Sequence, residues 1–195
     1  MSVIAAYYYN AGKRIREIAL DEHFEQDEAR SGFCWIALRE PSADELHTLQ
    51  AAYHLHPLAV DNAMHPLCPP KLEVYNDELY IVAQTAELVG DKISYGKTAI
   101  FTGHNHLITA RHGNGGALGN LREQLEASPT LLGKGVDYVL HAILHRIVDQ
   151  YLPIFEMIED DVLAMEKRSI DDFLGRDEVA RIFSLRGELT RFQRT

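Results

Sequence analysis

Three side chains of the kinds that bind metal ions lie one helical turn apart in the C-terminal third of the chain. His141, His145 and Asp149 stand at positions i, i+4 and i+8, so on a helix all three share one face. Two imidazoles at this spacing can chelate zinc, and the carboxylate would supply an oxygen ligand. The alternative is a solvated helix face, because the glutamate of an HExxH motif is missing. We interpret Asp149 as a carboxylate that faces a cation rather than as a catalyst.

A second group of potential ligands is a run of carboxylates on the same helical pattern. Carboxylates at this density favour hard divalent cations, which they hold loosely through the water shells of the ions. A solvent-facing surface, partly neutralised by neighbouring lysines and arginines, explains the run equally well. The run comprises Glu156, Glu159, Asp160, Asp161, Glu166, Asp171 and Asp172.

Histidines form two further clusters among the 10 in the chain. Either cluster could supply transition-metal ligands, or its members could lie at the polar edges of strands and helices. The first cluster is His54, His56 and His65, and the second is His104, His106 and His112.

Motifs for enzymatic chemistry are missing from the sequence. It contains no GxSxG, no P-loop and no GxGxxG after a strand. The glycine-rich loop Gly113–Gly116 lacks the Lys-Ser/Thr pair that would cradle a phosphate. Cys34 lies inside an apolar run and is expected to be inert core. We therefore expect no enzyme activity.

Charge and composition narrow the classes of partner. The 195 residues include 29 acidic side chains against 19 lysines and arginines, for a formal net charge of -10. Nucleic-acid binders normally carry a basic face, whereas an acidic surface attracts cations. No segment reaches the ~18 uncharged apolar residues that a membrane helix needs. Cys34 and Cys68 form no CxxC pair, which fits a reduced cytosolic compartment.

The first two thirds of the chain are predicted to form strands and short helices. Ser42 and Glu45 have the spacing of a capping box and open a helix, and Pro57 opens a second helix that ends at Met64. Phe33–Leu38 is continuously apolar, as expected for a buried central strand. The remaining predicted elements are a hairpin of Val3–Tyr9 and Arg14–Leu20, strands Lys71–Tyr75, Glu78–Thr85, Ile93–Thr102 and His106–Ala110, and a helix from Leu118 to near Ser128.

The last third of the chain is predicted to be helical. Apolar residues recur at helical spacing from Val136 to Leu163, which predicts one helix of roughly 30 residues with a kink at Pro153. A polar break at Ser169–Gly175 precedes a last helix, whose apolar pattern still runs at Thr195. Because no helix cap follows, we expect a fragment of a longer protein. An apolar stripe that outruns its own domain usually packs against partner helices, so oligomerisation is also expected.

One block of the sequence is more specific than these patterns. His56–Pro66, followed by Pro70–Tyr75 and Glu78–Val82, resembles the cytoplasmic domain of the CorA family of divalent cation transporters, which carries HPL-x-x-E-D and then P-K-hydrophobic-E at this point. The resemblance covers nearly the whole chain, because it continues through Phe33–Leu38 with Pro41, Asn105–Thr109, Asp137–Tyr138 and Ile147–Pro153.

The resemblance implies a three-layer α/β/α fold with a mixed sheet of about seven strands, the number also counted above. Residues 1–134 would form this funnel-shaped cytoplasmic domain, and residues 135–195 would form long antiparallel helices. These helices would lead to a stalk and two membrane helices with a Gly-Met-Asn signature beyond Thr195. The protein would then lie at the cytoplasmic face of the inner membrane, as part of an integral membrane protein.

Members of this family assemble as pentamers, in which cations bound between neighbouring cytoplasmic domains hold the pore closed. The resemblance thus implies a homopentamer that binds Mg²⁺, with Zn²⁺, Co²⁺ or Ni²⁺ as alternatives. The family's Glu-Asp pair appears here as Asp61-Asn62, which keeps an oxygen ligand at Asn62 but loses its charge. We expect weaker Mg²⁺ binding there, or sensing displaced to Asp61 and Asp149. His65 and Cys68 are softer ligands that favour zinc.

Two classes of function follow from these observations. The leading hypothesis is the cation-sensing domain of a CorA-like divalent metal transporter, with Asp61, Asn62 and Asp149 as regulatory residues and His65 and Glu73 as outside candidates. The alternative is a stand-alone metal-binding or scaffolding protein that oligomerises through its long helices. A hydrolase ranks third. The transported ion is selected by the pore and not by this domain.

Overall fold

A mixed sheet of seven strands lies at the centre of the molecule, in the order β2-β1-β3-β7-β6-β5-β4. The computed structural model describes residues 2–22, 32–65, 68–90, 92–113, 118, 120–171 and 175–193. β3 and β7 pair in parallel, and the other neighbouring strands pair antiparallel. The strands are β1 (Val3–Asn10), β2 (Lys13–Glu17), β3 (Gly32–Arg39), β4 (Lys71–Tyr75), β5 (Glu78–Val89), β6 (Lys92–Thr102) and β7 (His106–Gly113).

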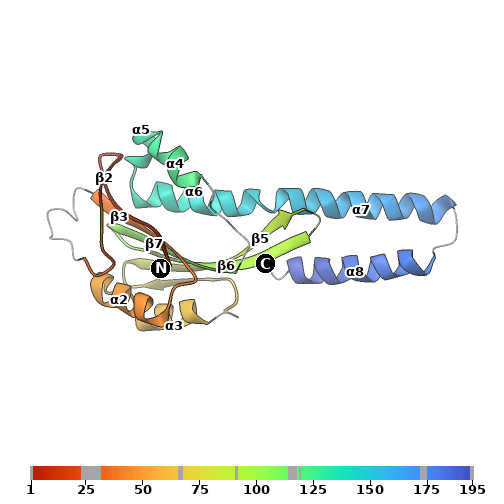
Figure 1. Cartoon of the computed structure of the whole chain (residues 1–195), viewed down its shortest axis with the longest axis horizontal. Coiled ribbons are helices and arrows are strands. Elements are labelled where there is room, and N and C mark those ends of the chain that lie inside the picture. Colours follow the sequence, from red (N-terminus) through yellow and green to blue (C-terminus); the bar gives the residue numbers. More distant parts are fainter. Residues whose placement is uncertain are drawn as a thin grey trace.

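Helices cover both faces of the sheet. α2 and α3 lie on one face and α4, α5 and α6 on the other (Figure 1). This arrangement confirms the predicted three-layer α/β/α fold with a mixed seven-stranded sheet. The helices are α2 (Ala43–Tyr53), α3 (Pro57–Met64), α4 (Leu121–Glu126), α5 (Pro129–Leu132), α6 (Val136–Asp149), α7 (Leu152–Asp171) and α8 (Arg176–Phe192).

Local sequence chemistry accounts for the starts of α2 and α3. The Ser42 hydroxyl accepts a hydrogen bond from the Glu45 N–H over 3.2 Å, and the Glu45 carboxylate accepts one from the Ser42 N–H over 2.8 Å. The predicted capping box is thus confirmed. α3 has a proline in its first turn, where an N–H would lack an intrahelical partner.

The strands β5 and β6 are longer than predicted. Their antiparallel ladder runs from Leu79 paired with Thr102 to Val89 paired with Lys92. The turn is made at Gly90, which has a φ of +60°. Polar and apolar residues alternate from Ala86 to Leu88 and from Lys92 to Tyr95, and a half-exposed hairpin tolerates such a pattern. The extension carries β5 toward the helices of the C-terminal region (Figure 1).

The single long helix predicted from Val136 to Leu163 is wrong in one respect. α6 ends at Asp149, and α7 begins at Leu152. Pro153 therefore lies in the first turn of a new helix, where it breaks no backbone hydrogen bond, and does not kink a continuous one. Figure 1 shows α7 continuing along the long axis of the molecule from α6, with α8 returning antiparallel beside it.

The core has three parts. Tyr80 and Val82 of β5 are 1% and 2% exposed on the α2–α3 face, and Ile81 is 8% exposed on the α6 face, so this strand is buried on both sides. α6 belongs to the second part, because Val139 and Ile143 pack there. In the third part, residues of α7 and α8 pack against the end of β5 around Ala86.

The described helices include none that is both long enough and apolar enough to cross a bilayer. The division of the chain at residues 134 and 135 stays a prediction, and α6 packs on the sheet as a part of its core.

Candidate cation site

The C-terminal end of α3 brings Asp61 and His65 together. The His65 N–H donates to the Asp61 carbonyl oxygen over 3.2 Å, which closes the last turn of the helix. One turn of helix separates the two side chains, and His65 Nε2 lies 3.5 Å from Asp61 Oδ2. Both side chains are exposed, at 67% for His65 and 61% for Asp61. A carboxylate and an imidazole are therefore presented side by side to solvent.

Asn62, the third predicted residue on α3, is half-buried. Its backbone carbonyl oxygen lies 3.4 Å from the ammonium of Lys97, a residue of β6 that is only 3% exposed. Burial lowers the pKa of Lys97. Sequence analysis did not single out Lys97. The pattern did contain a signal, since Lys97, Ala99 and Phe101 alternate along one strand, and the latter two belong to the core.

Glu73 lies on β4 and is engaged by neighbours on its own strand. Its carboxylate accepts a hydrogen bond from the Tyr75 hydroxyl over 2.8 Å and forms an ion pair with Lys71 over 3.0 Å. Both contacts lower the pKa of Glu73, and the hydrogen bond from the Tyr75 hydroxyl has the larger effect. Tyr75 in turn stacks on His56 at the start of α3, with ring centroids 3.9 Å apart. Glu73 thus lies near the beginning of α3, whereas Asp61 and His65 lie at its end.

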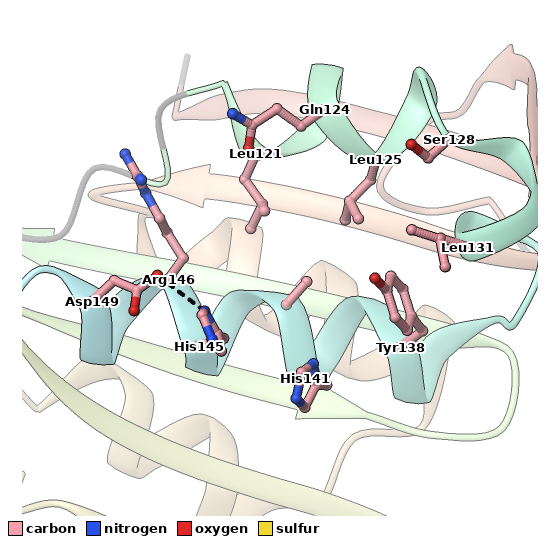
Figure 2. A pocket seen from close by; sticks show the side chains of 11 residues that line it. Leu121, Gln124, Leu125, Ser128, Leu131, Tyr138, His141, His145, Arg146 and Asp149 are labelled. Carbon is pink, nitrogen blue, oxygen red and sulfur yellow. Dashed lines mark ion pairs between the residues drawn. The ribbon is translucent and has the colours of Figure 1, made fainter.

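Asp149 lies at the end of α6, beside a groove between α4 and α6 with a volume of about 390 Å³ (Figure 2). Its Oδ2 is 3.0 Å from His145 Nδ1, and this ion pair is drawn in Figure 2. The His141 ring lies farther along the helix, with its centroid 5.9 Å from that of His145. Within the predicted triad, His145 and Asp149 form an ion pair, and His141 contacts the ring of His145.

No three His, Cys, Asp or Glu side chains converge as ligands for one ion within the described ranges. The described part of one chain therefore offers paired ligands, Asp61 with His65 and Asp149 with His145. A divalent ion held by either pair would take its remaining ligands from water or from another protein surface.

The first histidine cluster predicted from the sequence does not assemble. His56 caps α3, since its Nδ1 accepts a hydrogen bond from the Leu58 N–H over 3.3 Å. His54 ends α2 in the left-handed conformation, with a φ of 55°. His65 faces a potential co-ligand, the carboxylate of Asp61. His54 and His56 flank the junction of α2 and α3, whereas His65 lies at the opposite end of α3.

The second cluster is also dispersed. His106 is 4% exposed and packs on Tyr53, with ring centroids 5.3 Å apart. Burial lowers the pKa of His106 to about 4. His112 instead bonds the Glu40 carboxylate, with Nδ1 3.1 Å from Oε2. Two histidines of the strand thus have separate partners, and His106 lies in the core instead of at a polar edge.

The acidic run lies along α7, and one of its members links that helix to α8. Asp161 pairs with Arg181 of α8. Glu156, Glu159 and Asp160 are exposed. The side chains of Asp171 and Asp172 lie outside the described residues. Asp161 therefore fits the interpretation of a surface neutralised by neighbouring basic residues.

Comparison with known proteins places this geometry in a family. The family model described as CorA-like Mg2+ transporter protein matches residues 30–195. The chain belongs to this family. It is 27% identical to the putative metal ion transporter YfjQ of Bacillus subtilis over 161 residues, which are 83% of this chain and 50% of that protein. It is 22% identical to the cobalt/magnesium transport protein CorA of Methanocaldococcus jannaschii over 163 residues, 83% of this chain and 51% of that protein.

Solved structures show the same fold. The soluble domain of CorA from Methanocaldococcus jannaschii matches with a TM-score of 0.69 and 21% identity, over 95% of this chain and 72% of that one. The full-length CmaX protein matches with a TM-score of 0.75 and 19% identity, over 98% of this chain and 59% of that one. The cytoplasmic domain of ZntB from Vibrio parahaemolyticus matches with a TM-score of 0.72 and 14% identity, over 98% of this chain and 73% of that one. This CorA-like chain spans about half the length of the curated relatives it matches.

Proposed function

We propose that this chain is the cation-sensing, cytoplasmic regulatory domain of a CorA-like divalent metal transporter and has no enzyme activity. One observation carries the proposal. On a CorA-like fold, the segment that begins His56-Pro57-Leu58 ends in a helix turn that presents the exposed Asp61 carboxylate and the His65 imidazole 3.5 Å apart. Such a pair can hold a divalent ion, and no further protein ligand from the described part of the chain completes the coordination.

The incomplete ligand set supports sensing between copies of the chain. In the proposed homopentamer, carboxylates from neighbouring domains repel each other unless a divalent cation bridges them. Asp61 and Asp149 are the carboxylates we assign to this role. Loss of the ion then favours a looser arrangement of the domains, and a ligand that binds one arrangement better shifts the population toward it.

The ligand chemistry at α3 suggests which ions bind. Asp61 and Asn62 offer the oxygen ligands that Mg²⁺ prefers, but only one of them is charged. His65 adds a nitrogen ligand, which favours Co²⁺, Ni²⁺ or Zn²⁺ over Mg²⁺. We therefore propose that Mg²⁺ binds weakly and that the transition metals bind more tightly.

Exposed apolar residues on α7 and α8 also fit the alternative, a scaffolding protein that oligomerises through its helices. Large apolar side chains of α7 and α8 remain accessible, a pattern typical of surfaces that another element covers. They are Leu152 (58% exposed), Phe155 (54%), Leu163 (54%), Ile182 (39%) and Phe183 (66%). The same residues would serve assembly of a transporter, so they do not decide between the two functions.

Thermal unfolding with added metal tests the sensing role. We expect Mg²⁺, Co²⁺, Ni²⁺ and Zn²⁺ each to raise the Tm of the wild type, and Asp61→Ala to remove most of that rise. Equal stabilisation of both proteins by every ion would assign Asp61 a structural role only.

The reading frame after Thr195 tests the proposed transporter. We expect it to encode two apolar segments of ~20 residues. A stop codon directly after Thr195 would contradict the proposal.

A further inference from the structure

The buried lysine of β6 binds the end of α3 with its whole ammonium group. Lys97 Nζ donates to the carbonyl oxygens of Asn62 over 3.4 Å and Ala63 over 3.0 Å, and also to that of His65. An ammonium has three N–H donors, so each one has a backbone acceptor. Its positive charge meets the negative end of the helix dipole.

The neighbouring strand holds the chain just after this turn. Gln84 of β5 is the cross-strand partner of Lys97. Its side-chain N–H donates to the Cys68 carbonyl oxygen over 3.0 Å. The side chains of Lys97 and Gln84 therefore bind backbone carbonyl groups on both sides of positions 66 and 67, at His65 and at Cys68. Lys97 forms no ion pair among the described residues, so backbone carbonyl groups provide the contacts to its charge.

We propose that Lys97 is a positioning residue of the cation site: its ammonium, bound to the carbonyl groups of Asn62, Ala63 and His65, fixes the turn that carries the Asp61 and His65 side chains. The ammonium also occupies three oxygens that a hard cation would otherwise use as ligands. A metal ion at α3 is therefore confined to the outer side of the turn, where the Asp61 and His65 side chains are exposed. The use of this turn as a cation site rests on the proposed function, whereas the positioning itself does not.

Chemical rescue of a truncated lysine tests the role of the charge. Lys97→Ala removes the atoms from Cγ to Nζ, and n-propylammonium has the same size and charge as the removed group. The readout is hydrogen exchange of the His65 amide, which donates to the Asp61 carbonyl oxygen in the last turn of α3. We expect exchange to become about tenfold faster in Lys97→Ala, and to slow again with n-propylammonium but not with n-propanol.

Two further variants guard this test. Lys92→Ala, an exposed lysine on the same strand, should leave the His65 amide unchanged. Should Lys97→Ala fail to fold, Lys97→Met keeps most of the side-chain volume without the charge and should show the same faster exchange. Unchanged exchange in the Lys97 variants, or equal rescue by n-propanol, would overturn the proposal.

The metal response separates this inference from the proposed function. Stabilisation by Co²⁺ should fall in Lys97→Ala and return with n-propylammonium, in parallel with protection of the His65 amide. A wild type that no divalent ion stabilises would remove the proposed function, while the exchange data would still decide whether Lys97 fixes the turn. A Lys97→Ala protein that responds to Co²⁺ like the wild type, while Asp61→Ala does not, would show that the lysine does not position the site.

Discussion

Arg122 of α4 donates a hydrogen bond over 3.0 Å to the hydroxyl of Tyr9, a fully buried residue of β1. The same hydroxyl donates to the Glu126 carboxylate over 2.7 Å, so Tyr9 links two residues one turn apart on the helix. The Arg122 guanidinium also lies 3.9 Å from the centroid of the Trp35 ring. This network joins α4 to the sheet, and Leu121, Gln124 and Leu125 of the same helix line the groove in Figure 2.

Arg122→Met should destabilise the domain by about 2–4 kcal/mol, because it leaves the Tyr9 hydroxyl without its donor and removes the cation from the Trp35 ring. Urea unfolding of the two proteins measures the difference. Glu123→Ala, at an exposed position on the same helix, serves as the control and should change stability by less than about 0.5 kcal/mol. An Arg122→Met protein as stable as that control would contradict the assignment.

His106 should make stability depend on pH. Burial lowers its pKa from 6.5 to about 4 in the folded state, so the unfolded chain binds the proton more readily. The contribution of neutral His106 to the free energy of unfolding is then fully present above pH 6.5 and is lost as the pH falls toward 4. Between pH 6.5 and pH 5 the free energy of unfolding should fall by about 1 to 2 kcal/mol from this group.

Other groups also titrate in this range. One of them is Glu78, whose carboxylate lies 3.7 Å from His106 Nε2 and whose pKa is raised by burial. A comparison of variants isolates the effect of His106. Urea unfolding at both pH values should show a smaller pH dependence in His106→Asn than in the wild type. His47→Asn, an exposed histidine of α2, should keep the wild-type dependence. The same slope in all three proteins would refute the prediction.

Asn62→Asp should strengthen Mg²⁺ binding. It restores the second carboxylate of the family's acidic pair, and a second negative charge close to Asp61 increases the attraction for a divalent ion. We expect the midpoint of the Mg²⁺ titration, followed by thermal unfolding, to fall about tenfold. Without Mg²⁺ the variant should be slightly less stable than the wild type, because the two carboxylates repel. A midpoint that does not move would place Mg²⁺ binding elsewhere.

His65→Ala should weaken the binding of transition metals without weakening the binding of Mg²⁺. The imidazole lies 3.5 Å from the Asp61 carboxylate and is a ligand for Co²⁺, Ni²⁺ and Zn²⁺ but a poor one for Mg²⁺. Stabilisation by the transition metals should therefore fall, while stabilisation by Mg²⁺ should stay the same. A parallel loss for all four ions would instead indicate that His65 acts by shaping the end of α3.

Asp149→Asn should have little effect on the stability of the isolated chain. Its pair with His145 is exposed, with 47% of the Asp149 side chain accessible, and exposed pairs contribute about 0.5 kcal/mol or less. If Asp149 takes part in the sensor between copies, the variant should nevertheless lower the cation-dependent mass of the assembled protein in sedimentation. Sedimentation identical to the wild type with and without divalent ions would exclude that role.

Local patterns predicted much of the fold. The capping box at Ser42 and Glu45 needs only residues that are close in the sequence, and the buried strand Phe33–Leu38 is recognisable from composition alone. The break between α6 and α7 was not predictable in this way. Apolar residues continue at helical spacing across it, and Pro153 suits the first turn of a new helix as well as a kink.

The candidate site was predicted only in part. The contact between Asp61 and His65 follows from one turn of helix, although the sequence interpretation grouped His65 with His54 and His56. The role of Lys97 requires two segments more than 30 residues apart to meet, because its acceptors are backbone carbonyl groups of α3. No side-chain pattern in the sequence records where such groups lie.

Gln84 also contacts the residue that precedes α7. Its side chain bonds Cys68 beyond the turn of α3, and its backbone carbonyl oxygen accepts a hydrogen bond from the Tyr151 hydroxyl over 2.7 Å. Tyr151 directly precedes α7, a helix of 20 residues that is about 30 Å long at 1.5 Å per residue. Gln84 therefore ties the residue before α7 to the strand that also holds the chain after α3. A rotation of about 5° at this point would displace the far end of α7 by about 3 Å.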